Sequence, residues 1–267
     1  MDEKSGGAEP EKVETKPVVS LTEDVLLPSR GLLYGGKQPE GKVTVLALKM
    51  TEEKMLADPG RDRNAVLNDI IQRSTEGLNI PFNDLLLNDK LFLLFAVRIV
   101  SYGSGFEFNL RCPKCTAMNR YEVDLSKDLV IRILTPEDTE PFFVDLPIAG
   151  VKLGLRYLRI ADELEIERFV KQHLISKSGG DVAYSYRLAR LIVSMDDQPV
   201  APLAAMQFVD GLYSRDSYAI SDALADADFG VNLRIEKPCG RCGAVIEELF
   251  PFSADFFRPK RTVSRRT

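Results

Sequence analysis

The sequence is short of the residues and motifs on which many enzymes depend. It has no tryptophan and a single histidine among 267 residues. That histidine, His173, follows Phe169 and Val170 at helical spacing and has no serine or cysteine nucleophile motif beside it, which favours a partly buried structural role. The HExxH motif of metalloproteases, the dinucleotide-binding GxGxxG and the phosphate-binding GxxxxGK[ST] are also absent. We therefore predict a protein that is not an enzyme.

Long hydrophobic runs are absent as well. The longest apolar run, "LFLLFAV" at 91–97, lies between Lys90 and Arg98 and is far too short to span a bilayer. The N-terminus has no apolar stretch after a basic start, so we expect no signal peptide. The pattern predicts a soluble protein without a membrane partner, made in a reducing cytoplasm where structural disulfides are rare.

Charge is nearly balanced, except at the ends of the chain. The formal net charge of -5 argues against a general nucleic-acid binder, and a hydrophobic content of 45% is enough for a sizeable core. The polar start, "MDEKSGGAEPEKVETKPVVS", predicts a disordered N-terminal tail over 1–25. The last ten residues, "RPKRTVSRRT", carry five basic side chains and no acid, which predicts a basic C-terminal tail over 258–267.

Between the tails, residues 26–257 are predicted to form a single α+β domain. The predicted order is a helical N-terminal part over 42–101, a first CxxC hairpin over 104–126, a mixed and mostly helical insert over 127–228, and a second CxxC hairpin over 229–252. The N-terminal part contains a predicted strand at 42–48 and predicted helices at 63–74 and 88–100. The insert contains a predicted strand at 151–158, a helix whose capping box is Asp162 with Glu165, and helices at 181–195, 202–213 and 215–226.

All four cysteines fall in two identical CxxC pairs, in "LRCPKCTAMNRY" at 110–121 and "EKPCGRCGAV" at 236–245. Each pair is flanked by residues that alternate between apolar and polar, which predicts a strand, a CxxC turn and a second strand. Pro113 in the first pair, and Gly240 and Gly243 around the second, favour tight turns. The sequence therefore predicts two β-hairpins that each present two thiols at the turn.

Four thiolates are a preferred tetrahedral ligand set for zinc. We predict one structural Zn²⁺ that ties the hairpins into a zinc-ribbon-like unit, with four ligands: Cys112, Cys115, Cys239 and Cys242. Neighbouring basic side chains would offset the negative charge of the thiolates: Arg111, Lys114, Lys237 and Arg241. Two disulfides or free thiols, and an iron–sulfur cluster, stay open as alternatives. A four-thiolate site leaves no position for water, so a catalytic zinc is not expected.

A second function class stays open at this point. A zinc-ribbon unit can bind nucleic acid, and Lys114, Arg120 and Arg241, together with the basic tail, would then form the binding patch. The acidic net charge and the absence of tryptophan argue against this alternative. We therefore do not expect nucleic acid to be a partner.

The segment that follows the second hairpin, "FPFSADFF" at 250–257, is rich in aromatic side chains. Phe250 and Phe252 continue the strand alternation, which predicts that they face the core. Phe256 and Phe257 are adjacent, and on an extended chain two neighbours point to opposite sides. We therefore predict that one of them is either free for a partner or covered by an irregular turn.

The order of these features resembles a known family. "LPSRGLLY" comes first, then "TEEKMLAD", "LNDIIQR" and "LNDKLFLLFAVRIVSYG", which runs into "FEFNLRCPKC", and the second CxxC and Phe256–Phe257 close the pattern. Over roughly residues 26–257 the chain is similar to the baseplate hub protein family of T-even-type contractile-tailed bacteriophages. The resemblance implies a structural or assembly protein, either a hub component or a hub-assembly factor. Other phage tail or baseplate proteins would be its partners, in the host cytoplasm during assembly and in the virion baseplate if it is retained.

Overall fold

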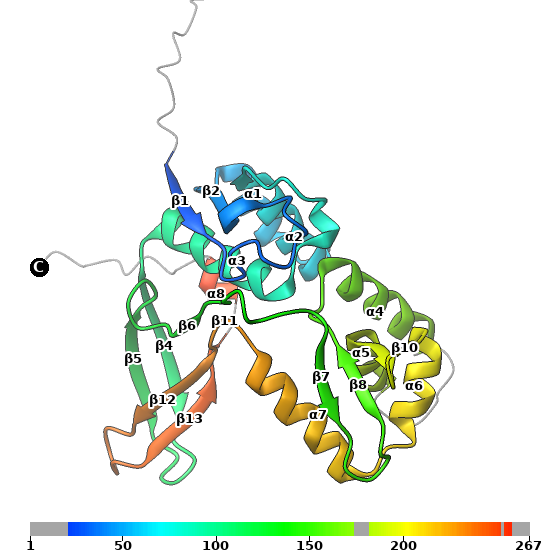
Figure 1. Cartoon of the computed structure of the whole chain (residues 1–267). Coiled ribbons are helices and arrows are strands. Elements are labelled where there is room, and N and C mark those ends of the chain that lie inside the picture. The colour runs from blue at the N-terminus through cyan, green and yellow to red at the C-terminus, as the bar shows by residue number, and fades with distance from the viewer. Residues whose placement is uncertain (1–20, 174–181, 252–253, 258–267) are drawn as a thin grey trace, which may run out of the picture.

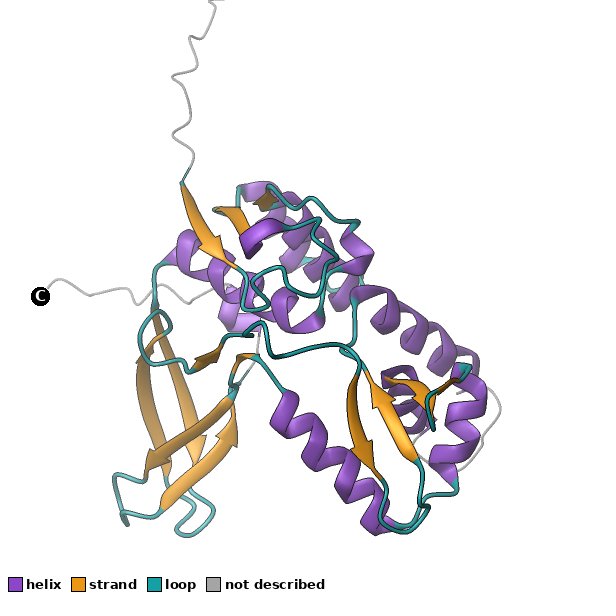
Figure 2. Cartoon of the chain, viewed as in Figure 1, coloured by secondary structure: helices purple, strands orange, loops and turns teal. Residues whose placement is uncertain are grey.

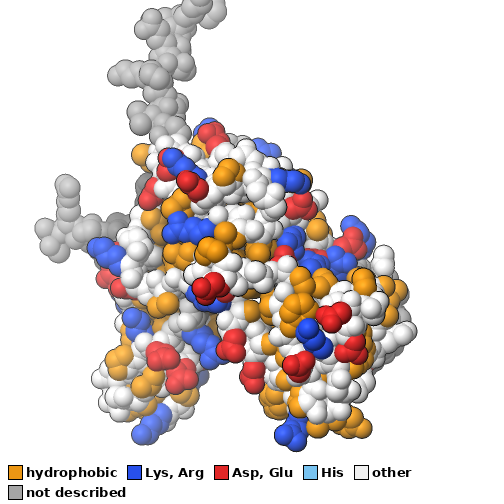
Figure 3. Space-filling model, viewed as in Figure 1, with side chains coloured by type: hydrophobic (Ala, Val, Ile, Leu, Met, Phe, Trp, Pro, Cys, Tyr) orange, Lys and Arg blue, Asp and Glu red, His pale blue; other side chains and the backbone are white. Residues whose placement is uncertain are grey.

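The computed structural model describes residues 21–173, 182–251 and 254–257. An N-terminal part forms the upper body, and two arms extend from it (Figure 1). One arm consists of the two CxxC hairpins, and the other is the insert between them in the sequence. A gap separates the two arms on the face drawn in Figure 3. The α+β class is confirmed, because the chain combines helices with several small antiparallel sheets (Figure 2).

The N-terminal part combines a three-stranded sheet with three helices. The sheet has the order β1-β2-β3, with β1 at Thr22–Leu26, β2 at Lys42–Leu46 and β3 at Thr75–Glu76. The helices are α1 (Met50–Ala57), α2 (Arg63–Arg73) and α3 (Leu87–Tyr102), and short 3-10 turns lie at Pro39–Gly41 and Phe82–Asp84. The predicted helices at 63–74 and 88–100 are confirmed. The predicted tail over 1–25 is too long, because Thr22–Leu26 pairs with Lys42–Leu46 along the edge of this sheet.

The segment "LPSRGLLY" is held against helix α3 by a buried carboxylate. Asp89 on α3 accepts hydrogen bonds from the backbone N–H of Ser29, at 3.0 Å, and from the hydroxyl of Tyr34, at 2.6 Å. The Tyr34 oxygen in turn accepts the N–H of Leu86 at 3.1 Å. Burial raises the pKa of Asp89, against the lowering effect of these donors. Gly31 has φ +75°, and a Cβ there would lie 1.8 Å from a backbone oxygen, so the turn requires glycine.

The two hairpins form the first arm. Strands β4 (Gly105–Arg111) and β5 (Met118–Asp124) pair antiparallel, as do β12 (Arg234–Pro238) and β13 (Val245–Leu249). Buried and exposed residues alternate along β4, as its sequence predicts. A two-stranded ladder of β6 (Ile131–Arg132) and β11 (Gly230–Val231) lies where the insert leaves and rejoins this arm. The predicted strand–CxxC–strand pattern is therefore confirmed in both places.

The insert is built on a four-stranded antiparallel sheet with helices around it. The sheet order is β10-β9-β8-β7, with β7 at Phe142–Asp145, β8 at Lys152–Leu155, β9 at Ile192–Met195 and β10 at Gln198–Pro199. The helices are α4 (Ile160–His173), α5 (Val182–Leu191), α6 (Pro202–Asp210) and α7 (Ser214–Ala227). The last two confirm the predictions at 202–213 and 215–226.

Three predictions for the insert are wrong in detail. The predicted helix at 181–195 ends at Leu191, because Ile192–Met195 pairs with β8 and satisfies its backbone there. Asp162 does not precede its helix, which begins at Ile160. The Asp162 carboxylate instead accepts the backbone N–H of Arg159 at 2.9 Å from within the first turn. The predicted strand at 151–158 is shorter, at Lys152–Leu155.

The hydrophobic residues form two cores. The first joins the N-terminal part to both hairpins and to the final helical turn, α8 (Ala254–Phe257). The second lies within the insert, between β7–β9 and helices α5, α6 and α7. The first core therefore contains residues from the beginning and the end of the chain, while the insert buries a core of its own.

Phe256 and Phe257 are both buried in the first core, with 0% and 2% of their surface exposed. Phe256 meets the ring of Phe95 edge-on at 5.0 Å and packs on Phe106 and Phe250. Of the two predicted outcomes, a ring that is free for a partner is therefore wrong. Both rings are covered, and the turn that carries them is helical and not irregular. Consecutive helical side chains point only about 100° apart, so both can enter one crevice. Phe252 lies outside the described residues.

Arg98 fastens this final turn to the rest of the core. Its side chain, on α3, is 1% exposed and donates to the Phe256 carbonyl oxygen at 2.6 Å. It also donates to the carbonyl oxygens of Gly103, at 2.6 Å, and Gly105, at 3.0 Å. The guanidinium thus joins α3, the start of β4 and α8, and burial lowers its pKa.

Candidate metal centre

The first CxxC turn has a hydrogen-bonded geometry that turns both sulfurs to one side. The N–H of Cys112 donates to the Ala117 oxygen at 2.9 Å, and the N–H of Thr116 donates back to the Cys112 oxygen at 2.9 Å. Thr116 takes a left-handed conformation with φ 58° to allow this. Such a backbone is strained for threonine, so tertiary contacts must hold the turn.

The second CxxC turn repeats these bonds. The N–H of Cys239 donates to the Ala244 oxygen at 2.8 Å, and the N–H of Gly243 donates to the Cys239 oxygen at 2.9 Å. Gly243 has φ 70° at the position that Thr116 takes in the first turn. The two turns are therefore the same local structure, and glycine makes the second one free of strain.

The two turns bring all four sulfurs together. Cys112 and Cys242 lie 3.7 Å apart at their Sγ atoms, and Cys115 and Cys239 lie 3.6 Å apart. All four ligand atoms lie within 4.8 Å of one another. Zinc–sulfur bonds of ~2.3 Å in a tetrahedron place the sulfurs about 3.8 Å apart, so the arrangement fits a four-thiolate metal site. These distances are too long for a disulfide bond of ~2.05 Å.

The backbone favours a thiolate in this cluster. The N–H groups of Cys242 and Arg241 face the sulfur of Cys239 and lower its pKa to about 6. The N–H of Ala117 acts the same way on Cys115, but burial and the neighbouring thiols outweigh it and raise the pKa of Cys115 to about 11. The thiolate of Cys239 therefore forms readily, and that of Cys115 is opposed. A divalent cation relieves this opposition, because thiolates are its ligands.

Two hydrogen bonds between the hairpins hold the turns in register. The Tyr121 hydroxyl donates to the Pro238 oxygen at 2.9 Å, and the Asn119 side-chain oxygen accepts the N–H of Gly240 at 2.9 Å. Sequence reasoning missed both side chains, because neither lies at a motif position. The only signal was their place in the strand that follows the first pair.

The basic residues predicted around the cysteines lie in the turns or at the strand ends beside them. Arg111 donates to the Thr116 oxygen at 3.3 Å. Arg120, assigned to the alternative nucleic-acid patch, forms an exposed ion pair with Glu107. Acidic and basic side chains are interspersed on the face drawn in Figure 3, without a continuous basic stripe. The face drawn therefore gives no specific support to the nucleic-acid alternative.

His173 is not part of the cysteine cluster. It lies at the end of α4, where its Nδ1 is 2.8 Å from the Phe169 oxygen and its ring stacks on Phe169 at 3.9 Å. The predicted partial burial of His173 is confirmed. Among the described residues, the four cysteines form the one group of histidine, cysteine and carboxylate side chains that is placed to hold a metal.

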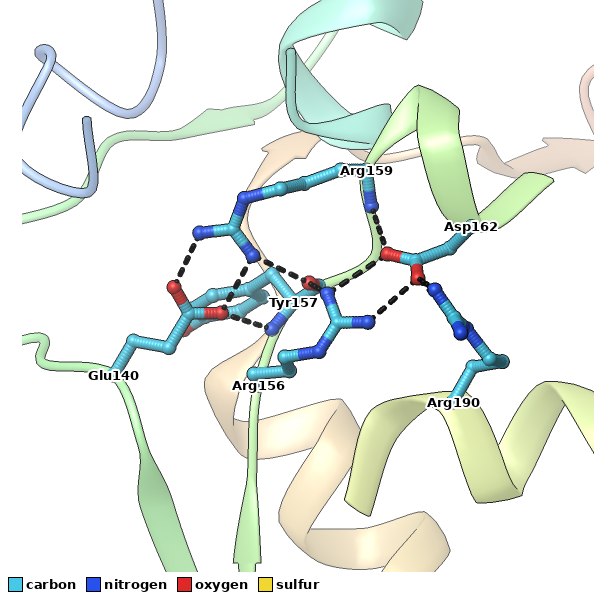
Figure 4. Close-up of polar contacts among 6 residues, drawn as sticks. All are labelled: Glu140, Arg156, Tyr157, Arg159, Asp162 and Arg190. Carbon is cyan, nitrogen blue, oxygen red and sulfur yellow. Dashed lines mark hydrogen bonds and ion pairs between the residues drawn. The ribbon is translucent and has the colours of Figure 1, made fainter. Parts of the chain in front are cut away.

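A second polar cluster lies where the insert meets the N-terminal part (Figure 4). Asp162, with 1% of its surface exposed, accepts from Arg156 at 2.6 and 2.8 Å and from Arg190 at 2.9 Å. Glu140 accepts from Arg159 at 2.6 Å and from the N–H of Tyr157 at 2.7 Å. Burial opposes the charge on Asp162, but the arginines and the Arg159 N–H outweigh it and hold its pKa below the ordinary value. The acidic residues near 162 thus support packing of the insert.

Comparison with known proteins assigns the chain to a class. A family model described as "T4 bacteriophage base plate protein" matches residues 35–258, which is most of the chain. The class is that of bacteriophage baseplate structural proteins. The chain belongs to the T4 bacteriophage base plate protein family, as the resemblance of its motifs predicts. Searches among curated proteins and among solved structures return no match. Within the described residues, no helix has the length and apolar character to cross a bilayer.

Proposed function

We propose that the chain is a structural or assembly protein of a contractile phage tail baseplate, either a hub component or a hub-assembly factor, and that it is not an enzyme. The family match over residues 35–258 carries this proposal. Its partners would be other tail or baseplate proteins. It would act in the host cytoplasm during assembly, and in the virion baseplate if it is retained.

We propose further that a structural Zn²⁺ is held by four thiolates, in a zinc-ribbon-like unit made from the two hairpins: Cys112, Cys115, Cys239 and Cys242. The clustering of the four sulfurs supports this. When bound, the ion supplies a cross-link between two segments that lie 124 residues apart. Structural zinc contributes on the order of 10 kcal/mol of apparent folding free energy in small domains. The chain's own part is to present four thiolates and to leave no position for water.

Metal content tests the zinc proposal directly. Protein purified without chelator should contain one equivalent of zinc by mass spectrometry, and its thiols should react slowly with a thiol reagent in the native state. Less than about half an equivalent, together with freely reactive thiols, would refute the site. A cluster of iron and sulfide would be recognised by its visible absorbance and its iron content.

A single ligand substitution tests whether both hairpins share the ion. Cys239→Ser should raise hydrogen exchange around Phe106–Val123 as well as Val231–Leu249, because the partner turn loses its metal too. Glu247→Gln on strand β13 of the same hairpin is the matched control, since it alters an exposed side chain outside the turn that offers no ligand. If exchange rises only near residue 239, the two pairs do not share a metal.

Complementation tests the biological role. Cells that supply Cys239→Ser in place of the wild-type chain should assemble fewer complete tails, while Glu247→Gln should support assembly. A salt-dependent DNA titration addresses the nucleic-acid alternative, and only weak binding that disappears without residues 258–267 is expected. Tight binding that persists without this tail would favour that alternative.

A further inference from the structure

Two apolar cavities lie side by side on the N-terminal part. The larger, of about 380 Å³, is lined mainly by leucines and one ring: Leu67, Leu87, Leu91, Leu94, Leu233 and Phe257. The smaller, of about 230 Å³, has five apolar walls: Met55, Leu56, Pro59, Val66 and Phe257. Phe257 and Arg63 line both cavities, so the two form one groove that the Phe257 ring divides.

The groove carries one positive charge that lacks a partner. Two acidic residues line it and both are paired, Asp58 with Arg61 at 3.9 Å and Glu163 with Lys90. Arg63, at the division between the cavities, is exposed and forms no ion pair or hydrogen bond within the described ranges 21–173, 182–251 and 254–257. The groove therefore offers two apolar pockets and an available guanidinium between them.

We propose that this groove docks an acidic, apolar segment of another protein. Two aliphatic or aromatic side chains of that segment fill the cavities, and a carboxylate between them pairs with Arg63. Buried apolar anchors supply most of the affinity in such contacts, and complementary charge sets the choice of partner. The chain's own C-terminal tail follows Phe257 directly, but its five basic residues and lack of acid do not suit Arg63. None of the cysteines lines the groove, so the docking proposal and the zinc proposal are tested independently of each other.

Peptide binding to the full-length chain tests the groove. The probes are fluorescein-labelled peptides with two leucines separated by two, three or six residues, and with either glutamate or lysine between them. For at least one spacing, fluorescence anisotropy should show the glutamate peptide binding about tenfold more tightly than its lysine counterpart. Arg63→Glu should reverse this preference, and Arg63→Gln should remove it.

Arg73→Glu is the matched control, because Arg73 is exposed on the same helix and the change in net charge is the same. It should leave the preference for glutamate unchanged. The proposal is overturned if no spacing favours glutamate, or if Arg73→Glu acts as Arg63→Glu does. It is also overturned if Arg63→Glu abolishes self-association in sedimentation velocity, which would make the occupant a second copy. Tighter peptide binding after removal of residues 1–20 would make the occupant the chain's own N-terminal segment, and would overturn it too.

Discussion

Replacement of Arg98 by methionine tests how the final helical turn is held. The substitution keeps a long side chain in the α3 position and removes the donors to three carbonyl oxygens, those of Phe256, Gly103 and Gly105. Methionine fills much of the same space, so the change probes the polar contacts more than the packing. The expected result is a loss of stability that begins at α8 and at the start of β4.

The size of the loss follows from two opposing terms. Each buried carbonyl left without a donor costs about 1–3 kcal/mol. Methionine also removes the cost of burying a guanidinium, and no carboxylate lies within ion-pair distance of Arg98 in the described part of the chain. We expect a net loss of about 3 kcal/mol. For a chain of this size, 1 kcal/mol corresponds to roughly 2–4 °C, so the melting temperature should fall by about 6–12 °C.

Circular dichroism during thermal unfolding measures the effect of Arg98→Met, and hydrogen exchange locates it. Exchange should rise at residues 254–257 and 103–106 before it rises in the insert. Arg73→Met, on an exposed position of α2, should change the melting temperature by less than about 2 °C. If Arg98→Met is equally silent, the three hydrogen bonds contribute nothing net and the reasoning is wrong.

Three further predictions concern other buried contacts. Tyr34→Phe removes the donor to Asp89 and should destabilise the chain by about 1–3 kcal/mol in urea unfolding. Phe257→Ala should cost about 3–5 kcal/mol and join the two cavities beside it, which a thermal melt and a solvent-shift fluorescence probe would detect. Asp162→Asn should cost about 3 kcal/mol at pH 7, because Arg156 and Arg190 lose a buried carboxylate. The pKa of Asp162 lies below its ordinary value of 3.8, so the stability that its carboxylate contributes is present above that pH and is lost as the pH falls through the folded pKa. The difference in unfolding free energy between wild type and Asp162→Asn should therefore shrink below about pH 4. Urea unfolding across pH 2.5–7 measures this difference.

Local periodicity predicted the helices and strands whose burial pattern follows the spacing of their own apolar residues. Helices α2 and α3 bury residues at helical spacing, and burial alternates along strands β4 and β5. Their own sequences are therefore enough to predict them. Predictions failed where a distant segment decided the outcome. Ile192–Met195 follows a helix without a break and becomes a strand only because β8 offers a free edge. Thr22–Leu26 looks like the end of a tail, yet β2 recruits it into a sheet.

The cysteine cluster could be predicted from the sequence because residue type and spacing alone indicate a metal site. Two CxxC pairs in hairpin contexts predict convergence of four thiols, and the sulfurs do converge. The supporting contacts were not accessible, since Asn119 and Tyr121 act through the opposite hairpin. The burial of Phe256 and Phe257 was missed for a related reason. Their environment depends on Arg98, which lies 158 residues before its acceptor at Phe256. The sequence around Phe256 and Phe257 therefore does not indicate this contact.

The wide separation of the paired cysteines has a consequence for synthesis on the ribosome. The first hairpin emerges with Cys112 and Cys115 exposed, and its partner cysteines are added about 124 residues later. At translation rates of ~5–20 residues per second, the first two thiols wait roughly 6–25 s for the second pair. The carbonyl of Phe256 reaches Arg98 later still. The part of the protein that is made first is thus the last to be completed. A nascent chain stalled within the insert exposes both an open aromatic core and a half-formed thiol cluster to proteases.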